Sequence, residues 1–291
     1  MHYYIRLFMQ SQLKTYYFII FLSYFLCSGV YANNSTASST FINNQAPRTL
    51  AANHLLQTNN EWKKLLDQSQ FERVISTAQA IVKIDANNQD AIYYHALALQ
   101  LSNRSEQAQP LFANLVDQHQ RQANHINLMR LGLSQFYLGD NRAAIDTLGQ
   151  VAAKQHAPLK AQLYLAYALA RNNQLNLAIA AFDKVIAKHQ GHSVYYNRGL
   201  AHFAANNLAQ AAKDMRLTIE QKPDFHQPYY DLITIYVKLS QPKQALMWLN
   251  TLLARRETNL AQFRQDPALE QFIQSSGYQN LVKRYELDSE P

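Results

Sequence analysis

The chain has 291 residues, of which 48% are hydrophobic and 16% charged, a balance typical of a folded protein rather than a disordered one. Its formal net charge of +7 comes from lysines and arginines scattered along the sequence, so it indicates a solvated surface and argues against nucleic-acid binding. Glycine is scarce while Ala, Leu, Gln and Asn are abundant, which favours helices joined by short polar turns.

Residues 1–32 have the pattern of an export signal. Arg6 and Lys14 precede an apolar run over residues 16–26, and small residues lead to a cleavage position after Ala32. The run is shorter than the ~20 residues that span a bilayer. We therefore expect a cleaved signal peptide and a periplasmic or secreted protein. The alternative is an uncleaved segment that anchors the chain in the inner membrane, the only membrane contact we expect.

Residues 33–50 are polar and of low complexity, and we expect them to form a flexible leader. The single cysteine, Cys27, lies within the predicted signal peptide. The mature chain would therefore have no disulfide bond and no cysteine-ligated metal ion.

A repeat of about 34 residues follows the leader. An alanine recurs after each polar turn at spacings of 36, 34, 33 and 34 residues, and we call this the anchor position. A larger side chain, the filler, stands four residues after each anchor, and a small or apolar residue, the small position, stands twelve before it. The anchors are Ala108, Ala144, Ala178, Ala211 and Ala245; the fillers are Phe112, Leu148, Phe182, Met215 and Leu249; the small positions are Ala96, Gly132, Ala166, Gly199 and Ile233.

This pattern predicts that each repeat is a helix, a tight turn and a second helix. A small residue lets two helices approach closely, and the filler occupies the space beside it. Residues 240–242, Ser-Gln-Pro, combine a capping residue with a proline suited to the first turn of a helix. Two small positions depart from the rule, with Trp62 in the first repeat and Ile233 in the sixth. Pro110 lies inside a predicted helix and should distort its first turns.

Two segments resemble the tetratricopeptide repeat, a helix–turn–helix unit of 34 residues. They are LMRLGLSQFYLGDNRAAIDTLGQV (residues 128–151) and VYYNRGLAHFAANNLAQAAKDMRLTIEQKPD (residues 194–224). The resemblance implies an all-α fold, a right-handed superhelical solenoid of about six helix–turn–helix repeats over residues 51–257. Residues 258–291 then form a C-terminal capping helix and tail.

The resemblance also implies how the chain would bind a partner, because the first helix of each tetratricopeptide repeat lines a concave surface. Positions on that helical stripe are rich in tyrosine and include two arginines, side chains that are favoured at protein interfaces. The alternative for each aromatic ring on this stripe is that it packs between helices. The candidate partner-binding residues are Tyr93, Tyr94, Met129, Arg130, Phe136, Tyr137, Tyr164, Tyr167, Arg171, Tyr196, Asn197, Tyr230 and Asp231.

We expect a non-enzymatic scaffold or adaptor that binds a peptide or protein segment along this groove. The alternative is a structural or assembly subunit of a cell-envelope complex that docks through its convex face or its C-terminal tail. Arg130 and Lys160 suit the carboxylate clamp of some family members, which grips a partner's C-terminus. Leu97, Leu133 and Tyr167 replace the asparagines of that clamp, so we do not expect it here.

The sequence predicts no enzyme, no cofactor, no metal site and no nucleic-acid partner. His189 and His192 could share a metal ion, but their spacing fixes no third ligand, and a surface turn is the better interpretation. The sequence contains no glycine-rich phosphate loop and no paired carboxylates in a predicted cleft.

Overall fold

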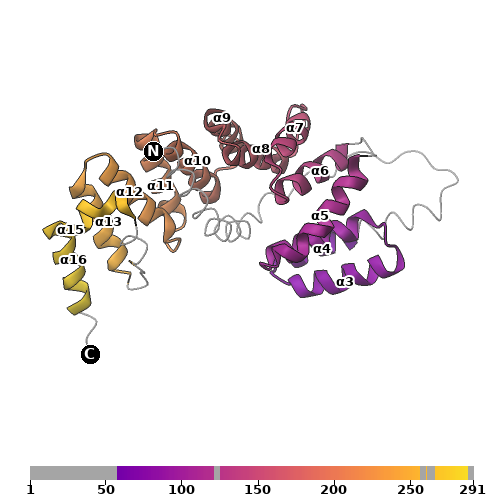
Figure 1. Ribbon diagram of the computed structural model, residues 1–291, viewed down its shortest axis with the longest axis horizontal. Helices are drawn as coiled ribbons and strands as arrows, with labels where there is room; N and C mark the ends of the chain where they lie inside the picture. Colours follow the sequence, from indigo (N-terminus) through magenta and orange to yellow (C-terminus); the bar gives the residue numbers. More distant parts are fainter. Residues whose placement is uncertain (1–57, 121–124, 256–259, 261–265, 288–291) are drawn as a thin grey trace. The chain divides into compact units, whose positions relative to one another are not determined.

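The computed structural model describes residues 58–120, 125–255, 260 and 266–287, and these residues form helices joined by turns, with no strand among them (Figure 1). The all-α class expected from the sequence is therefore confirmed. The predicted signal peptide, the leader and the first residues of the predicted repeat array lie outside the described residues.

The helices follow one another in pairs, one pair for each repeat. The pairs are residues 58–67 with α3 (Phe71–Ile84), α4 (Gln89–Leu101) with α5 (Ser105–Gln120), α6 (His125–Tyr137) with α7 (Asn141–Ala152), α8 (Leu159–Arg171) with α9 (Leu175–Ile186), α10 (His192–Ala204) with α11 (Leu208–Gln221), and α12 (Gln227–Lys238) with α13 (Pro242–Leu253). The chain divides into an N-terminal part that ends at Ala168 and a C-terminal part that begins at Leu169, and each is described by itself.

The same turn joins the two helices of every pair. One residue in each turn has a φ between 57° and 83°, in the left-handed region, and the following amide bonds back to the first helix. The amide of Arg104 donates to the Leu99 carbonyl at 2.9 Å, and that of Asn207 donates to the His202 carbonyl at 2.8 Å. This arrangement is the Schellman motif, which ends a helix. The left-handed residues are Ser69, Asn103, Gly139, Asn173, Asn206 and Ser240, at the spacing of the repeat.

Close helix packing occurs at the small positions, as the sequence predicted. A Cβ atom added to Gly132 would lie 2.6 Å from Cγ of Leu148, the filler of the same repeat. A Cβ atom added to Gly199 would lie 3.1 Å from Cε of the filler Met215. Every anchor alanine and every filler is buried. The α6–α7 pair and the α10–α11 pair are therefore each held together by one narrow contact and the apolar side chains around it.

The first repeat reverses the sizes at two of these positions. Val74, 34 residues before Ala108, stands at the anchor position of this repeat. Trp62 occupies the small position and is buried, while Ala78 stands where the other repeats have a filler. The Trp62 Nε1 donates to Oγ1 of Thr77 at 2.8 Å, and its ring lies 5.1 Å from the Tyr94 ring. A large residue fits at the small position because a small one stands at the filler position.

Pro110 does not interrupt its helix. The α5 helix runs from Ser105 to Gln120 with Pro110 inside it, and the proline is exposed. Pro110 lacks the amide hydrogen that would bond to Glu106. The expected distortion therefore does not divide α5 into two segments.

The C-terminal residues pack on the last repeat. They comprise η3 (Pro267–Leu269), α15 (Glu270–Gln274) and α16 (Ser276–Leu287), with η3 in contact with α12 and α16 in contact with α13. A Cβ atom added to Gly277 would lie 2.7 Å from Cδ1 of Leu246. The Tyr285 hydroxyl donates to Oδ1 of Asn250 at 3.0 Å. A helix therefore packs on the last repeat, where the sequence predicts a C-terminal capping helix.

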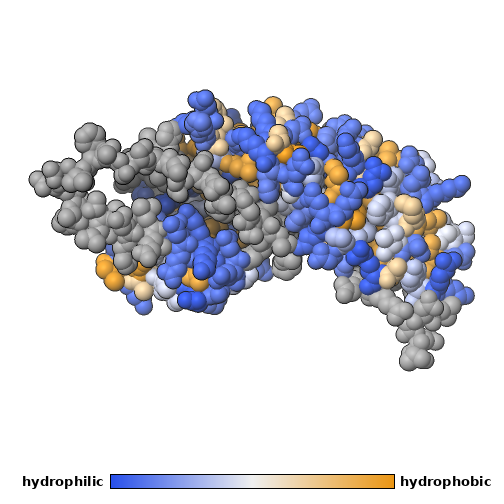
Figure 2. Space-filling view, turned by 180° about the vertical axis from the view of Figure 1, so that it is seen from behind, coloured by the Kyte–Doolittle hydropathy of each residue, from blue (hydrophilic) through white to orange (hydrophobic). Residues whose placement is uncertain are grey.

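The surface is largely hydrophilic on the face seen in Figure 2, where hydrophobic residues show between hydrophilic ones in small groups. Apolar side chains are mostly used in helix packing. Among the residues that the structure describes, no helix is long and apolar enough to cross a membrane.

Candidate protein-interaction surface

The predicted partner-binding residues lie on the first helices of the repeats, and most of them are buried. Met129, Arg130, Tyr137, Arg171 and Asp231 are half-buried. Their binding role stays a prediction, but the structure shows that the tyrosine rings have contacts within the protein. The buried members are Tyr93, Tyr94, Phe136, Tyr164, Tyr167, Tyr196, Asn197 and Tyr230.

An aromatic cluster links three helices of the N-terminal part. The Tyr137 ring stacks on Phe112 with centroids 4.9 Å apart, and the Phe136 ring meets Tyr164 edge to face at 5.0 Å. The Tyr137 and Tyr164 hydroxyls lie 2.5 Å apart, and the Tyr167 ring continues the cluster 5.7 Å from Tyr164. Aromatic pairs of this geometry each contribute about 0.5–1.5 kcal/mol beyond the area they bury. These rings therefore stabilise the packing of α5, α6 and α8.

Arg130 is engaged within the N-terminal part as well. Its guanidinium forms an ion pair with Asp90 and lies 5.7 Å from the centroid of the Tyr93 ring. The other Asp90 oxygen accepts from Nδ2 of Asn59 at 3.0 Å. An anionic group of a partner could bind Arg130 only by competing with the Asp90 carboxylate.

In the C-terminal part, a hydrogen bond joins α10 and α12, the first helices of successive repeats. The Tyr196 hydroxyl donates to Oδ2 of Asp231 at 2.9 Å, and Nε2 of Gln227 donates to Oδ1 of the same residue at 3.3 Å. The Tyr196 ring also meets the Phe225 ring edge to face at 4.9 Å. The two helices therefore lie side by side, with Tyr196 between them.

Further along the same two helices, apolar side chains are less covered. Leu200 and Phe203 of α10 and Thr234 and Val237 of α12 are half-buried, and Lys238 is exposed. The Lys238 ammonium lies 5.7 Å from the centroid of the Phe203 ring. We call these five residues the first-helix patch. They stand one, four and five residues after the small positions, a spacing that places them on one helical stripe.

An ion network around the buried Asp214 holds α9, α10 and α11 together, and no sequence pattern predicted it. Arg198 donates to both carboxylate oxygens of Asp214, at 2.6 and 2.8 Å, and to Oδ1 of Asp183 at 2.7 Å. Asp214 is 1% exposed. The hydrogen bond to Asp214 is the main cause of a further rise in the pKa of the Arg198 guanidinium. The network fixes the packing of these helices.

The histidines do not gather with other potential metal ligands in the part of the chain that the structure describes. Over those residues, no group of three or more His, Cys, Asp or Glu side chains could hold a metal ion. His192 is half-buried at the start of α10, and burial is the main cause of its lowered pKa, followed by the nearby Lys222.

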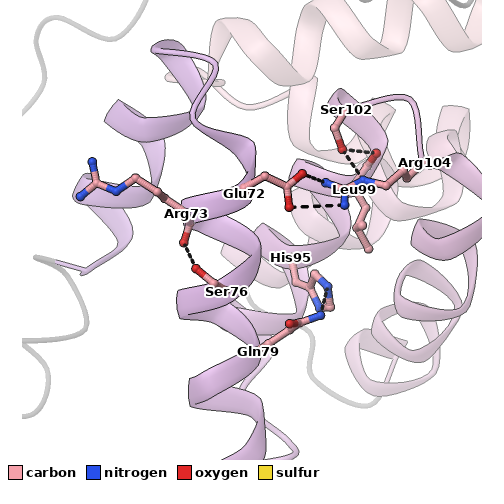
Figure 3. A network of polar contacts seen from close by, with 8 residues as sticks. All are labelled: Glu72, Arg73, Ser76, Gln79, His95, Leu99, Ser102 and Arg104. Carbon is pink, nitrogen blue, oxygen red and sulfur yellow. Dashed lines mark hydrogen bonds and ion pairs between the residues drawn. The ribbon is translucent and has the colours of Figure 1, made fainter.

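Figure 3 shows a further polar network, which is also structural. The Arg104 guanidinium forms an ion pair of 2.6 Å with Glu72, and a ring nitrogen of His95 lies 3.3 Å from Nε2 of Gln79. Both contacts link α3 to the helix that follows it or to the turn beyond.

The fold and the repeated turn define an α-helical repeat protein. Residues 129–193 and 166–224 match the family model described as Tetratricopeptide repeat. Over these residues the match confirms the resemblance to the tetratricopeptide repeat that the sequence pattern predicted. No curated protein matches the sequence.

Several solved structures are similar to this chain at low sequence identity. Cut9, in the APC/C hetero-tetramer Cut9–Hcn1, is 15% identical with a TM-score of 0.52, over 76% of this chain and 40% of that one. The C-terminal part of a TPR repeat-containing protein from Cytophaga hutchinsonii is 14% identical with a TM-score of 0.50, over 79% of this chain and 90% of that one. MamA from Desulfovibrio magneticus RS-1 is 16% identical with a TM-score of 0.49, over 60% of this chain and 98% of that one.

Proposed function

We propose that the protein binds a peptide or protein segment on the first-helix patch of its C-terminal part. That the chain is a protein-interaction scaffold in general follows from its repeat family, and no catalytic family is indicated. The observation that carries the finer proposal is the partial exposure of Leu200, Phe203 and Val237 on two adjacent first helices. Their neighbours Tyr196 and Tyr230 are buried, so a partner can reach the patch more easily than these two tyrosines.

The patch has the composition of a binding surface. An aromatic ring, two aliphatic side chains and a threonine lie beside an exposed lysine. Covering the remaining exposed area of such side chains stabilises a complex by about 25 cal/mol per Å² of apolar surface, before the costs of association. A short segment lying across α10 and α12 would cover all five residues of the patch.

A peptide-display selection against the purified protein tests this function. Selected peptides should bind the unchanged protein and lose about tenfold or more in affinity for a Leu200→Asp, Phe203→Asp double variant. Thr234→Gln provides a second variant, because its larger uncharged side chain covers part of the patch without removing an apolar side chain. The matched controls are Leu177→Asp and Met247→Asp, at exposed apolar residues on second helices. Circular dichroism confirms that each variant is folded.

Peptides that bind all the variants equally would contradict the proposal. That result would favour the structural-subunit alternative, in which the chain docks through another face or through its tail. A truncation of the tail would then be the next variant to examine.

Export of the protein is a separate proposal, supported by the charge and apolar pattern of residues 1–32. Fractionation of producing cells and N-terminal sequencing of the purified protein test it. We expect a mature chain that begins after Ala32. A chain that keeps its first residues in a membrane fraction would favour the anchored alternative.

A further inference from the structure

The first-helix patch carries an exposed positive charge. Lys238 is exposed, and no ion pair to a carboxylate occurs for it within the described parts of the chain. Its ammonium is placed beside the Phe203 ring, 5.7 Å from the centroid. The charge therefore lies at the edge of the apolar surface.

The nearest acidic side chain on α12 is already engaged. Both carboxylate oxygens of Asp231 accept hydrogen bonds, one from Tyr196 at 2.9 Å and one from Gln227 at 3.3 Å. A cationic ligand would have to compete with these donors, whereas an anionic ligand would meet Lys238 directly. The charges beside the patch are thus arranged to favour a negative partner.

We propose that the occupant of the first-helix patch is an acidic amphipathic peptide segment. Its apolar side chains lie against Leu200, Phe203 and Val237, and one of its carboxylates pairs with the Lys238 ammonium. This inference rests on the proposed function and adds the chemical class of the partner. The bound segment displaces water from the apolar side chains of the patch. The ion pair is strengthened because the local dielectric constant falls.

Two pools of synthetic peptides test the charge of the partner. The peptides of both pools are ten residues long and labelled with fluorescein. Leu or Phe, chosen at random, occupies the same positions in both pools. The remaining positions are Asp or Glu in one pool and Lys or Arg in the other. Fluorescence anisotropy is measured at low and high salt. We expect the full chain to bind the acidic pool about tenfold more tightly, with a preference that weakens at high salt.

Charge reversal at Lys238 provides the decisive variant. Lys238→Glu should abolish or invert the preference between the pools. Lys213→Glu is the matched control, because Lys213 is exposed on α11 and the change in net charge is the same. The control should keep the preference of the unchanged protein.

The outcomes separate this inference from the proposed function. Equal binding of both pools, lost in an uncharged Leu200→Ser, Phe203→Ser variant, would overturn the acidic partner and leave the patch as the binding site. A preference for the acidic pool that survives Lys238→Glu would also overturn it. Binding of neither pool would overturn the acidic partner, while the display selection would still decide whether the patch binds peptides at all.

Discussion

Gly132 of α6 faces Leu148 of α7 so closely that a Cβ atom at Gly132 would lie 2.6 Å from the leucine Cγ. No side chain fits there without moving the filler. We predict that Gly132→Ala lowers the free energy of unfolding by about 1–3 kcal/mol, the usual effect of overpacking, less the gain in helix propensity. Urea denaturation followed by circular dichroism measures the change.

Gly149 is the matched control for this prediction. It lies in the same repeat, in α7, and a Cβ atom there would have no neighbour within 4 Å. Gly149→Ala should therefore raise the free energy of unfolding by up to about 1 kcal/mol. Equal effects of the two substitutions would show that close packing at Gly132 is not what the small position supplies.

The turns offer a stabilising change. Ser240 has a φ of 57°, in the left-handed region that costs a residue with a side chain about 1 kcal/mol. Ser240→Gly should therefore raise the free energy of unfolding by up to about 1 kcal/mol. Thermal denaturation checks it against Gly139→Ala, which places a side chain at a φ of 83° and should have the opposite effect. A lower melting temperature for Ser240→Gly would contradict this account of the turn.

The Arg198–Asp214 pair should be one of the most sensitive points of the C-terminal part. Arg198→Met leaves the Asp214 carboxylate buried without its main partner, and breaking a buried pair in this way costs about 3–5 kcal/mol. Denaturation of the variant measures the loss. Arg104→Met is the comparison, because Glu72 is largely exposed and such surface pairs contribute under about 1 kcal/mol. Similar losses in both variants would contradict the structural role of the network around Asp214.

The half-buried histidines predict a loss of stability in acid. Burial is the main cause that lowers the pKa of His95, His192 and His202 below the ordinary 6.5. Between the folded and unfolded pKa values, the unfolded chain binds more protons, so the free energy of unfolding falls as pH decreases below about 6.5.

This effect is measured by denaturing the unchanged protein and a His202→Gln variant at several pH values between about 7 and 5. These pH values bracket the ordinary pKa of histidine. The variant should lose part of the dependence on pH. A pH dependence that is the same in both proteins would assign the effect to groups other than His202.

The repeated features of the fold could be predicted from the sequence because they depend on local geometry. The 34-residue spacing, the small positions and the polar turns all concern residues that meet within one helix pair, such as Gly132 and Leu148. Helix periodicity places such residues on facing surfaces, so their sizes reveal the contact. Residues 1–50 carry predictions that the described residues leave untested.

Contacts between repeats were decided only by the tertiary structure. The tyrosines on the first-helix stripe could be predicted as a row, but which rings are buried depends on partners elsewhere, such as Phe112 in α5 and Phe225 in the turn before α12. The ion pair of Arg198 with Asp183 likewise joins one repeat to the preceding one. A single sequence records the type of each side chain. It does not record which charges and rings from separate helices meet, because that depends on how every helix is turned about its axis.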